Sequence, residues 1–174
     1  MGFTNIEIKA TCSLAHQQRI KAFLKQQQAE YRGRDHQIDT YFKVTAGRLK
    51  LREGTIENHL IHYERENEAG PRPSDIMLYE SAPEHVQQLK SILEASLGIL
   101  TVVDKIRHIY FIENVKFHLD EVQGLGRFVE IEAIDTEGCI GRARLLEQCK
   151  AYREQLNIPE SNLISYSYSD VLLS

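Results

Sequence analysis

Short stretches in which hydrophobic and polar residues alternate make up most of the chain. Successive side chains of a strand point to opposite faces of a sheet, so this alternation is typical of half-buried β-strands. About eight strands are predicted, at residues 5–10, 37–44, 48–53, 59–66, 75–81, 102–112, 115–122 and 126–134. Short links rich in Gly, Asn and Pro favour antiparallel hairpins over a parallel doubly wound sheet.

Three further stretches repeat their hydrophobic residues every three to four positions, as an amphipathic helix does. They cover residues 13–30, 81–98 and 141–158. Ser13 is the predicted N-cap of the first helix, and Ser81 with Glu84 forms a predicted capping box in the second. We expect all three helices to pack against the outside of the sheet.

The polar faces of the strands are sorted by charge, unlike the mixed polar face of an ordinary solvated sheet. In the first strand, Ile6 and Ile8 share one face while Glu7 and Lys9 share the other. Basic side chains follow on two later strands, namely Arg48, Lys50, Arg52, Lys105 and Arg107. Acids lie on the last two strands, namely Asp120, Glu130 and Glu132. Solvated ion pairs would explain one such face, but the pattern recurs along the chain.

The helices are expected to cover the apolar faces of these strands. The charged faces must then point toward one another. About eight antiparallel strands can close into a barrel, and closure removes the sheet edges and encloses a cavity. We therefore expect an α+β fold: a closed antiparallel eight-stranded β-barrel with a charged tunnel and helices packed outside. With 174 residues, of which 42% are hydrophobic, the whole of residues 1–174 is expected to form one domain.

The charges predict what such a tunnel would bind. Two carboxylates about 5 Å apart repel by roughly 3 kcal/mol at an effective dielectric constant of about 20, so an acidic cluster takes up protons or a cation. Oxygen ligands without His or Cys spacing favour Mg²⁺ or Mn²⁺ over Zn²⁺. Clustered Lys and Arg side chains call for a polyanion, and guanidinium groups suit bidentate phosphate contacts. A polyphosphate bound together with a divalent metal would neutralise both the basic and the acidic side chains.

Composition narrows the set of partners. The net charge of −4 gives no indication of nucleic acid or an anionic membrane as a partner. The longest apolar run is too short to cross a bilayer. The three cysteines form no C-x-x-C pair and are expected to be free thiols that fill the core. A cytoplasmic location is therefore expected.

The segment NIEIK resembles the N-terminal E-x-E-x-K signature of a known family. Further matches follow in order: DTYF, GRLKLRE, GPRPSD, DKIRHIY, HLDEVQGLGRFVEIE and SYSD. The family is that of the CYTH proteins, the triphosphate tunnel metalloenzymes, which include class IV adenylyl cyclases, thiamine triphosphatases and inorganic triphosphatases. The ordered set is most similar to the class IV cyclase-like branch.

The resemblance implies a closed tunnel in which basic residues bind a triphosphate and acids at one side hold one or two divalent ions. The implied phosphate contacts are Lys9, Arg48, Lys50, Arg52, Lys105 and Arg107. The implied metal ligands are Glu7, Asp120, Glu130 and Glu132. Of these, the expected catalytic residues are Glu7, Glu130 and Glu132.

Two positions depart from the family pattern. Asn5 stands where the first glutamate of the signature belongs, which removes a negative ligand but keeps an amide oxygen. The strand at residues 59–66 lacks the usual inward lysine and offers Glu64 and Arg65 instead. Arg65 is a further predicted phosphate contact, and a solvated edge charge is the alternative for it.

Other side chains have more than one interpretation. His118 shares a face with Asp120 and could relay a proton, although a hydrogen-bonded structural histidine is favoured. The loop at residues 66–75 could be a lid that carries Arg72 over the tunnel mouth, or a plain surface loop. Tyr168 is expected to pack rather than to seal one end of the tunnel.

The expected function is metal-dependent processing of a triphosphate. The first hypothesis is an adenylyl cyclase-like conversion of ATP into cyclic AMP and pyrophosphate. The alternatives are an inorganic or thiamine triphosphatase that releases orthophosphate, and a non-catalytic polyphosphate-binding module. The expected ligand is therefore ATP, tripolyphosphate or thiamine triphosphate, with Mg²⁺ or Mn²⁺ as cofactor. A homodimer is left open, and neither nucleic acid nor membrane is an expected partner.

Overall fold

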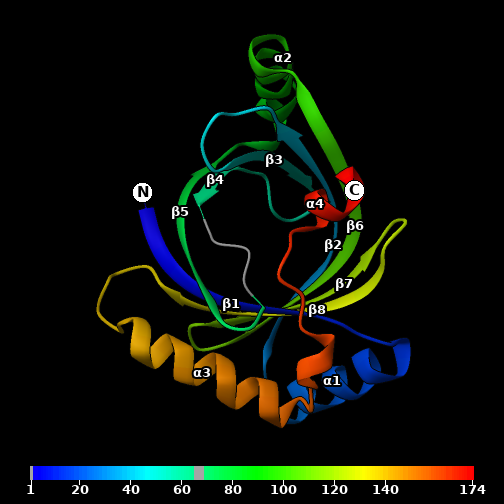
Figure 1. The fold of residues 1–174 in the computed structure, drawn as a ribbon, viewed down its shortest axis with the longest axis vertical. Coiled ribbons are helices and arrows are strands. Elements are labelled where there is room, and N and C mark those ends of the chain that lie inside the picture. Colours follow the sequence, from blue (N-terminus) through cyan, green and yellow to red (C-terminus); the bar gives the residue numbers. More distant parts are fainter. Residues whose placement is uncertain (1, 65–68) are drawn as a thin grey trace.

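The protein forms a closed antiparallel barrel in a computed structural model that describes residues 2–64 and 69–174. Within these residues, eight strands pair in the order β1-β5-β4-β3-β2-β6-β7-β8 (Figure 1). The strands are β1 (Gly2–Thr11), β2 (Glu30–Phe42), β3 (Arg48–Gly54), β4 (His59–Glu64), β5 (Arg72–Glu80), β6 (Ile99–Ile112), β7 (Val115–Val122) and β8 (Gly126–Asp135). The predicted fold class is confirmed, although several strands begin or end at other residues than predicted.

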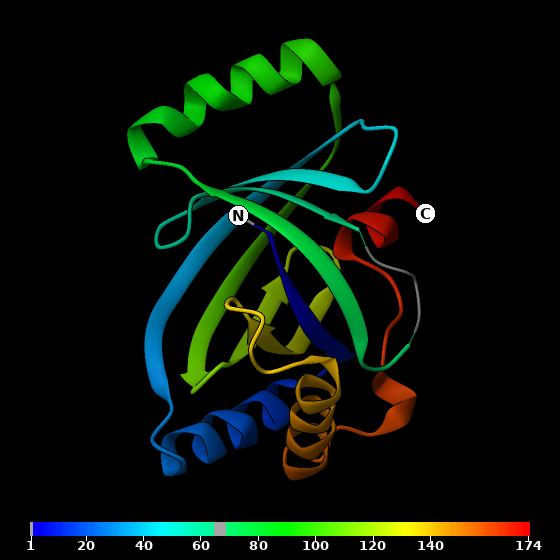
Figure 2. The same cartoon turned by 90° about the vertical axis from the view of Figure 1, so that its left-hand side faces the viewer.

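Helices lie on two sides of the barrel, with α1 and α3 on one side and α2 on the other (Figure 2). The helices are α1 (Leu14–Gln26), α2 (Val86–Leu97), α3 (Arg142–Gln155) and α4 (Tyr168–Leu173), with the short 3-10 helices η1 (Pro83–His85) and η2 (Glu160–Asn162). Ser13 caps α1 as predicted, because its side chain accepts a hydrogen bond from the His16 N–H. The capping box at Ser81 is wrong: η1 begins at Pro83 with Ala82 as its N-cap, and the Ser81 hydroxyl donates to the Ala82 carbonyl.

The apolar faces of β1, β7 and β8 lie outside the barrel, beneath α1 and α3 (Figure 1). Ile8, Phe117 and Ile131 are fully buried in this layer, and each such side chain stabilises the fold by about 1.5–3 kcal/mol. A smaller core around Phe42 and Leu51 lies beneath α2. The helices therefore cover the apolar faces, and the charged faces turn inward, as the alternation predicted.

A third apolar cluster lies inside the barrel, where the C-terminal segment covers one end. It joins Tyr41 and Phe128 of the strands to Ile164 and Tyr168. The Ile164 N–H donates to the Lys9 carbonyl at 3.0 Å, which anchors the segment to β1. Figure 1 shows this segment crossing the barrel before it reaches α4. A helix as short as α4 shows no clear helical period, and the sequence pattern did not predict it.

The structure also shows where the cysteines lie and whether any helix could cross a membrane. Cys12 and Cys149 are buried free thiols, as expected, whereas Cys139 is exposed. Cys139 lies in the loop that follows β8, outside any helix or strand. Among the residues that the structure describes, no helix combines the length and the apolar character that a membrane span requires.

Candidate functional site

The barrel encloses a cavity lined by all eight strands and by the C-terminal segment. Its basic lining consists of Lys9, Lys50, Arg52, Lys105, Arg107 and Lys116. Its acidic lining consists of Glu7, Glu57, Glu130 and Glu132. The structure thus brings most of the residues predicted from strand alternation into one enclosed space, which we call the tunnel.

A single buried carboxylate, that of Asp39 in β2, gathers three cations of the tunnel. Lys105 Nζ lies 2.6 Å and Lys50 Nζ 3.0 Å from Asp39 Oδ2. Arg52 donates to both carboxylate oxygens, at 2.8 and 2.9 Å. The barrel order places β2 between β3 and β6, which carry these cations. Asp39 was not predicted as a site residue, although it lies two residues from Tyr41 on β2 and therefore shares the inner face with it.

Positive charge exceeds negative charge in this cluster: three cations share Asp39, and Glu57, the second carboxylate partner of Arg52, is itself shared with Lys116. Burial would raise the pKa of Asp39, but the three cations outweigh it and hold that pKa well below its usual range. Burial lowers the pKa of Lys105, and the neighbouring Arg52 and Arg107 lower it further, against the attraction of Asp39. Repulsion among the cations therefore favours a further anion in the tunnel.

Arg107 of β6 joins the acids of β7 and β8. Its Nε and Nη2 atoms donate to the Asp120 carboxylate at 2.7 and 2.5 Å, and Nη2 donates to Glu130 Oε2 at 3.1 Å. Glu130 also binds Lys9 Nζ at 2.8 Å and His118 Nδ1 at 3.0 Å. Glu130 is thus the common partner of side chains from three other strands.

These contacts set the protonation states around Glu130. Burial would raise the pKa of Glu130, but Lys9 and Arg107 outweigh it and hold that pKa well below its usual range. Burial, followed by the charge of Arg107, lowers the pKa of His118 to about 4. His118 is therefore neutral near pH 7 and hydrogen-bonded, which matches its structural interpretation.

The two remaining acids of the tunnel meet where β1 pairs with β8, since Glu7 and Glu132 are register partners. Arg72 of β5 donates to Glu7 Oε1 at 3.1 and 3.3 Å, and the Asn5 amide nitrogen donates to Glu132. Burial raises the pKa of Glu132, and the charges of Glu7 and Glu130 add to the rise. Lys116 and the Asn5 amide oppose this rise, so the corner holds two neighbouring carboxylates beside the charges of Arg72 and Lys116.

The donors at this corner fit a hard divalent cation. The Asn5 Oδ1 atom is buried and finds no hydrogen-bond partner in the described part of the chain. The raised pKa of Glu132 likewise marks an anion that a cation would stabilise. The described residues contain no group of three or more His, Cys, Asp or Glu side chains arranged to hold a metal. Glu7, Glu132 and the Asn5 amide oxygen nevertheless supply only oxygen donors, the kind that Mg²⁺ and Mn²⁺ prefer.

Two predicted site residues do not line the tunnel cavity. Arg48 lies outside the tunnel lining, because α4 places Asp170 beside it and Arg48 Nη2 donates to that carboxylate at 2.9 Å. Asp120 is fully buried, and the Tyr168 hydroxyl donates to it at 2.7 Å in addition to its guanidinium partner. Arg65 lies outside the described residues.

Several tunnel residues were missed or misplaced from the sequence. Arg72 is not on a lid: it is the first residue of β5, and its side chain is buried inside the barrel. Lys116 lies on the same face of β7 as the predicted acid Asp120, because their positions differ by an even number. Period-two alternation would therefore have predicted it. Glu57 comes from a loop, where no alternation exists. The ring of Tyr168 lies 3.9 Å from Lys9 Nζ, so this tyrosine lines the tunnel rather than only packing.

A family model for the CYTH domain matches residues 4–168, nearly the full chain. The chain belongs to the CYTH domain family. A relative from Methanocaldococcus jannaschii, named "Putative adenylate cyclase", is 29% identical to this CYTH domain over 140 residues. The match covers 77% of this chain and 75% of the relative.

Solved structures show the same fold. A Vibrio parahaemolyticus protein described as a "putative adenylate cyclase" has a TM-score of 0.77 and 20% identity, over the whole of both chains. A Hippeastrum protein described as a "putative adenylyl cyclase" with a dominant triphosphatase activity has a TM-score of 0.65 and 17% identity, over 97% of this chain and 94% of that one. CYTH proteins are adenylyl cyclase-like or triphosphatase enzymes that generally use divalent metals, which supports a triphosphate-processing tunnel here.

Proposed function

We propose that this CYTH domain binds ATP in its tunnel and converts it, with a divalent metal, into cyclic AMP and pyrophosphate. The observation that carries the proposal is the Asp39 cluster, in which Lys50, Arg52 and Lys105 share one carboxylate. Phosphate oxygens would supply the missing negative charge. Charged hydrogen bonds of this kind are stronger in a buried cavity than in water.

The apolar side chains on the opposite wall of the tunnel favour a substrate that carries an organic group. The apolar lining from β1, β4 and β5 consists of Phe3, Ile61, Tyr63, Ile76 and Leu78. In the barrel order, β4 and β5 stand across from β6 and β7, which carry Lys105 and Arg107. A base or thiamine ring would bury apolar surface on this wall, whereas inorganic tripolyphosphate would leave it unused.

The residues of the chain have distinct parts in the proposed reaction. The ribose 3′-oxygen forms a bond to the α-phosphorus, the bond from that phosphorus to the pyrophosphate oxygen breaks, and the hydroxyl proton is released. Lys50, Arg52 and Lys105 hold the phosphate chain and neutralise the charge that develops on pyrophosphate. Glu130 keeps Arg107 oriented toward the same space.

Glu7, Glu132 and the Asn5 amide oxygen are the proposed holders of the metal. Mg²⁺ or Mn²⁺ bound there would neutralise phosphate charge and activate the attacking oxygen. The metal-binding roles of Asp120 and Glu130 stay predictions, since both bind Arg107 here. Removing divalent ions with EDTA is expected to abolish turnover, and product formation in excess EDTA would contradict metal dependence.

The test of the activity is to incubate the purified protein with ATP, tripolyphosphate and thiamine triphosphate, each with Mg²⁺ or Mn²⁺. We expect cyclic AMP and pyrophosphate from ATP. Orthophosphate release would instead indicate a triphosphatase, the alternative favoured by the description of the Hippeastrum structure. Salt-sensitive binding without any turnover would indicate a polyphosphate-binding module.

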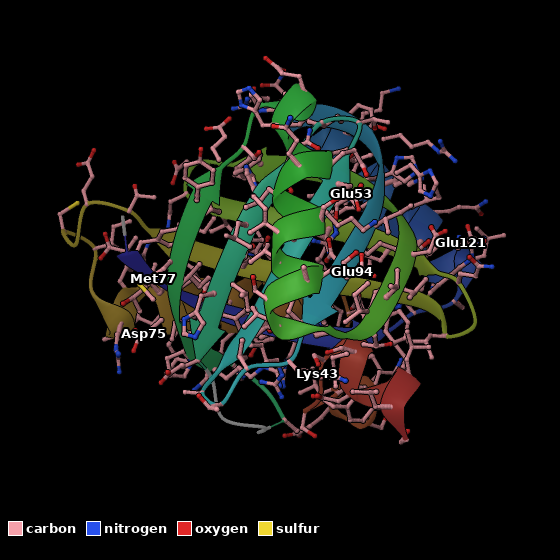
Figure 3. All side chains as sticks on the ribbon, turned by 90° about the horizontal axis from the view of Figure 1, so that it is seen from above. Lys43, Glu53, Asp75, Met77, Glu94 and Glu121 are labelled. Carbon is pink, nitrogen blue, oxygen red and sulfur yellow. The ribbon has the colours of Figure 1, made fainter. Side chains whose placement is uncertain are left out.

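Lys105→Ala is expected to weaken substrate binding about tenfold to a hundredfold, since it removes a buried charged donor to phosphate. The measurement is KM for the substrate that turns over, or Kd for tripolyphosphate. Lys43→Ala is the matched control, because Lys43 is exposed and lies outside the tunnel lining (Figure 3). Equal constants for the wild type and Lys105→Ala would remove Lys105 from the phosphate site.

A further inference from the structure

The loop that follows Gly54 joins β3 to β4 and is held by a buried acid. Asp35 of β2 is fully buried and accepts a hydrogen bond from the Thr55 hydroxyl at 2.9 Å. It also accepts from the backbone N–H groups of Ile56 and Glu57, at 2.9 and 3.1 Å. This end of β3 is opposite to the end that the C-terminal segment covers, so the loop lies at the other mouth of the tunnel.

The atoms around Gly54 leave no room for a larger residue at the start of this loop. A Cβ atom at residue 54 would lie 2.5 Å from the Glu57 carbonyl oxygen and 2.8 Å from Asp35 Oδ1, closer than real side chains come. Only glycine therefore fits this turn. The Asn58 Oδ1 atom accepts a hydrogen bond from the Gly54 N–H at 3.2 Å, which closes the turn. The result is one acidic side chain, that of Glu57, directed into the tunnel.

The Glu57 carboxylate bridges two cations of the tunnel. Oε1 accepts from Lys116 Nζ at 2.5 Å, and Oε2 accepts from Arg52 Nη1 at 3.0 Å. Gln37 Nε2 donates to Oε2 at 3.2 Å. Burial would raise the pKa of Glu57, but Lys116 and Arg52 outweigh it and hold that pKa well below its usual range. Glu57 is therefore a permanent negative charge at neutral pH, inside a site whose other features favour anions.

We propose that Glu57 is a specificity-determining residue, whose carboxylate occupies the place of one anionic group between Arg52 and Lys116 and so limits the length of the phosphate chain that the tunnel accepts. This proposal rests on the proposed function, because it assumes a polyphosphate in the tunnel. Arg52 then has two carboxylate partners, Asp39 and Glu57, on either side of its guanidinium group. A phosphate chain long enough to reach Lys116 would have to displace or lie beside Glu57, and like charges at that distance repel.

The variant that tests this is Glu57→Gln, which removes the charge and keeps the shape. Binding of inorganic pyrophosphate, tripolyphosphate and tetrapolyphosphate is measured by calorimetry at one ionic strength. We expect Glu57→Gln to bind tripolyphosphate about tenfold more tightly than the wild type does, and to gain more for tetrapolyphosphate. Pyrophosphate is expected to gain least, because the short chain need not reach Lys116.

Two further variants separate the charge of Glu57 from its packing. Glu57→Asp keeps the charge and is expected to keep the wild-type preference for chain length. Glu53→Gln makes the same charge change on the outside of the barrel, where Glu53 binds Lys90 of α2 at 2.7 Å (Figure 3). It is expected to leave all three dissociation constants unchanged. Thermal unfolding of each variant confirms that the protein tested is folded.

The outcomes distinguish this inference from the proposed function. If the wild type binds tripolyphosphate and Glu57→Gln binds every chain length equally well or more weakly than the wild type, Glu57 only holds Arg52 and Lys116 in place, and the specificity role is overturned while the proposed function stands. If Glu57→Asp loses the preference as Glu57→Gln does, the charge is not responsible, which also overturns the inference. If neither the wild type nor any variant binds a polyphosphate, the proposed function fails and the inference fails with it.

Discussion

Asp39→Asn is expected to lower the free energy of unfolding by about 3–5 kcal/mol, the cost of removing one partner from a buried ion pair. The reason is that Lys50, Arg52 and Lys105 would be left together in the tunnel with a neutral amide between them. For a chain of this length the melting temperature would fall by roughly 6–20 °C. Thermal and denaturant unfolding of the purified variant measure the change.

The matched control for this prediction is Asp75→Asn, in which the same chemical change is made at an exposed carboxylate of β5 (Figure 3). Its free energy of unfolding is expected to differ from that of the wild type by no more than about 0.5 kcal/mol. If Asp39→Asn were as stable as the control, the cations of the tunnel would not depend on Asp39, and the charge excess inferred for this cluster would be wrong.

The low pKa of Asp39 predicts how the stability of the protein changes at acid pH. Because the pKa of Asp39 in the folded protein is held well below its usual value, the folded state binds this proton less readily than the unfolded state does. The stabilisation is therefore fully present above the unfolded pKa of about 3.9 and is lost as the pH falls toward the lower folded pKa. The difference in stability between the wild type and Asp39→Asn is expected to narrow below about pH 4. A difference that stays constant down to pH 3 would contradict the ion-pair origin of the effect.

Glu130→Gln is expected to lower the turnover number by roughly a hundredfold to a thousandfold, the range for losing one preorganised charged contact, while substrate binding weakens less. Glu130 is the common partner of Lys9, Arg107 and His118, and an amide at this position no longer balances the two cations. Misplaced cations stabilise the charge that develops during the reaction less well. The measurement is the separate determination of kcat and KM for the substrate that turns over.

Glu121→Gln is the control for Glu130→Gln, because Glu121 is an exposed carboxylate on the same strand pair and binds Arg127 outside the tunnel (Figure 3). Its kinetic constants are expected to equal those of the wild type. An unchanged kcat in Glu130→Gln would remove Glu130 from the reaction. A rise in KM with kcat unchanged would assign Glu130 to substrate binding alone.

The predicted residues that line the tunnel share one property: they lie inside regular strands. Lys50 and Arg52 point into the tunnel because they alternate with apolar residues that α2 covers. The same period places Glu130 and Glu132 inside, opposite Val129 and Ile131 in the core beneath the helices. Period-two alternation is a local property of the chain, so it can be recognised without knowledge of the neighbours of each strand.

Residues outside this pattern were missed for different physical reasons. Arg48 has the correct alternation, but its place near the end of the barrel lets Asp170 of the unpredicted α4 bind it. Glu57 reaches the tunnel from a loop, and its direction depends on hydrogen bonds to Asp35 from a distant part of the chain. Contacts between residues far apart in sequence leave no periodic trace, so nothing in the local pattern predicted them.

The alternation of charged and apolar residues was sufficient for the barrel and for the inward direction of its Lys, Arg and Glu side chains, because both follow from which face of a strand must be buried. The anion and the divalent metal stay predictions. The partner of each charge came only from the closed structure. Barrel closure decides which strands are neighbours and which segment covers each end, and this placed Asp39 among three cations, bound Asp120 to Arg107 and directed Glu57 between Arg52 and Lys116. Coulomb energies depend on distances across strands, and those distances exist only after folding.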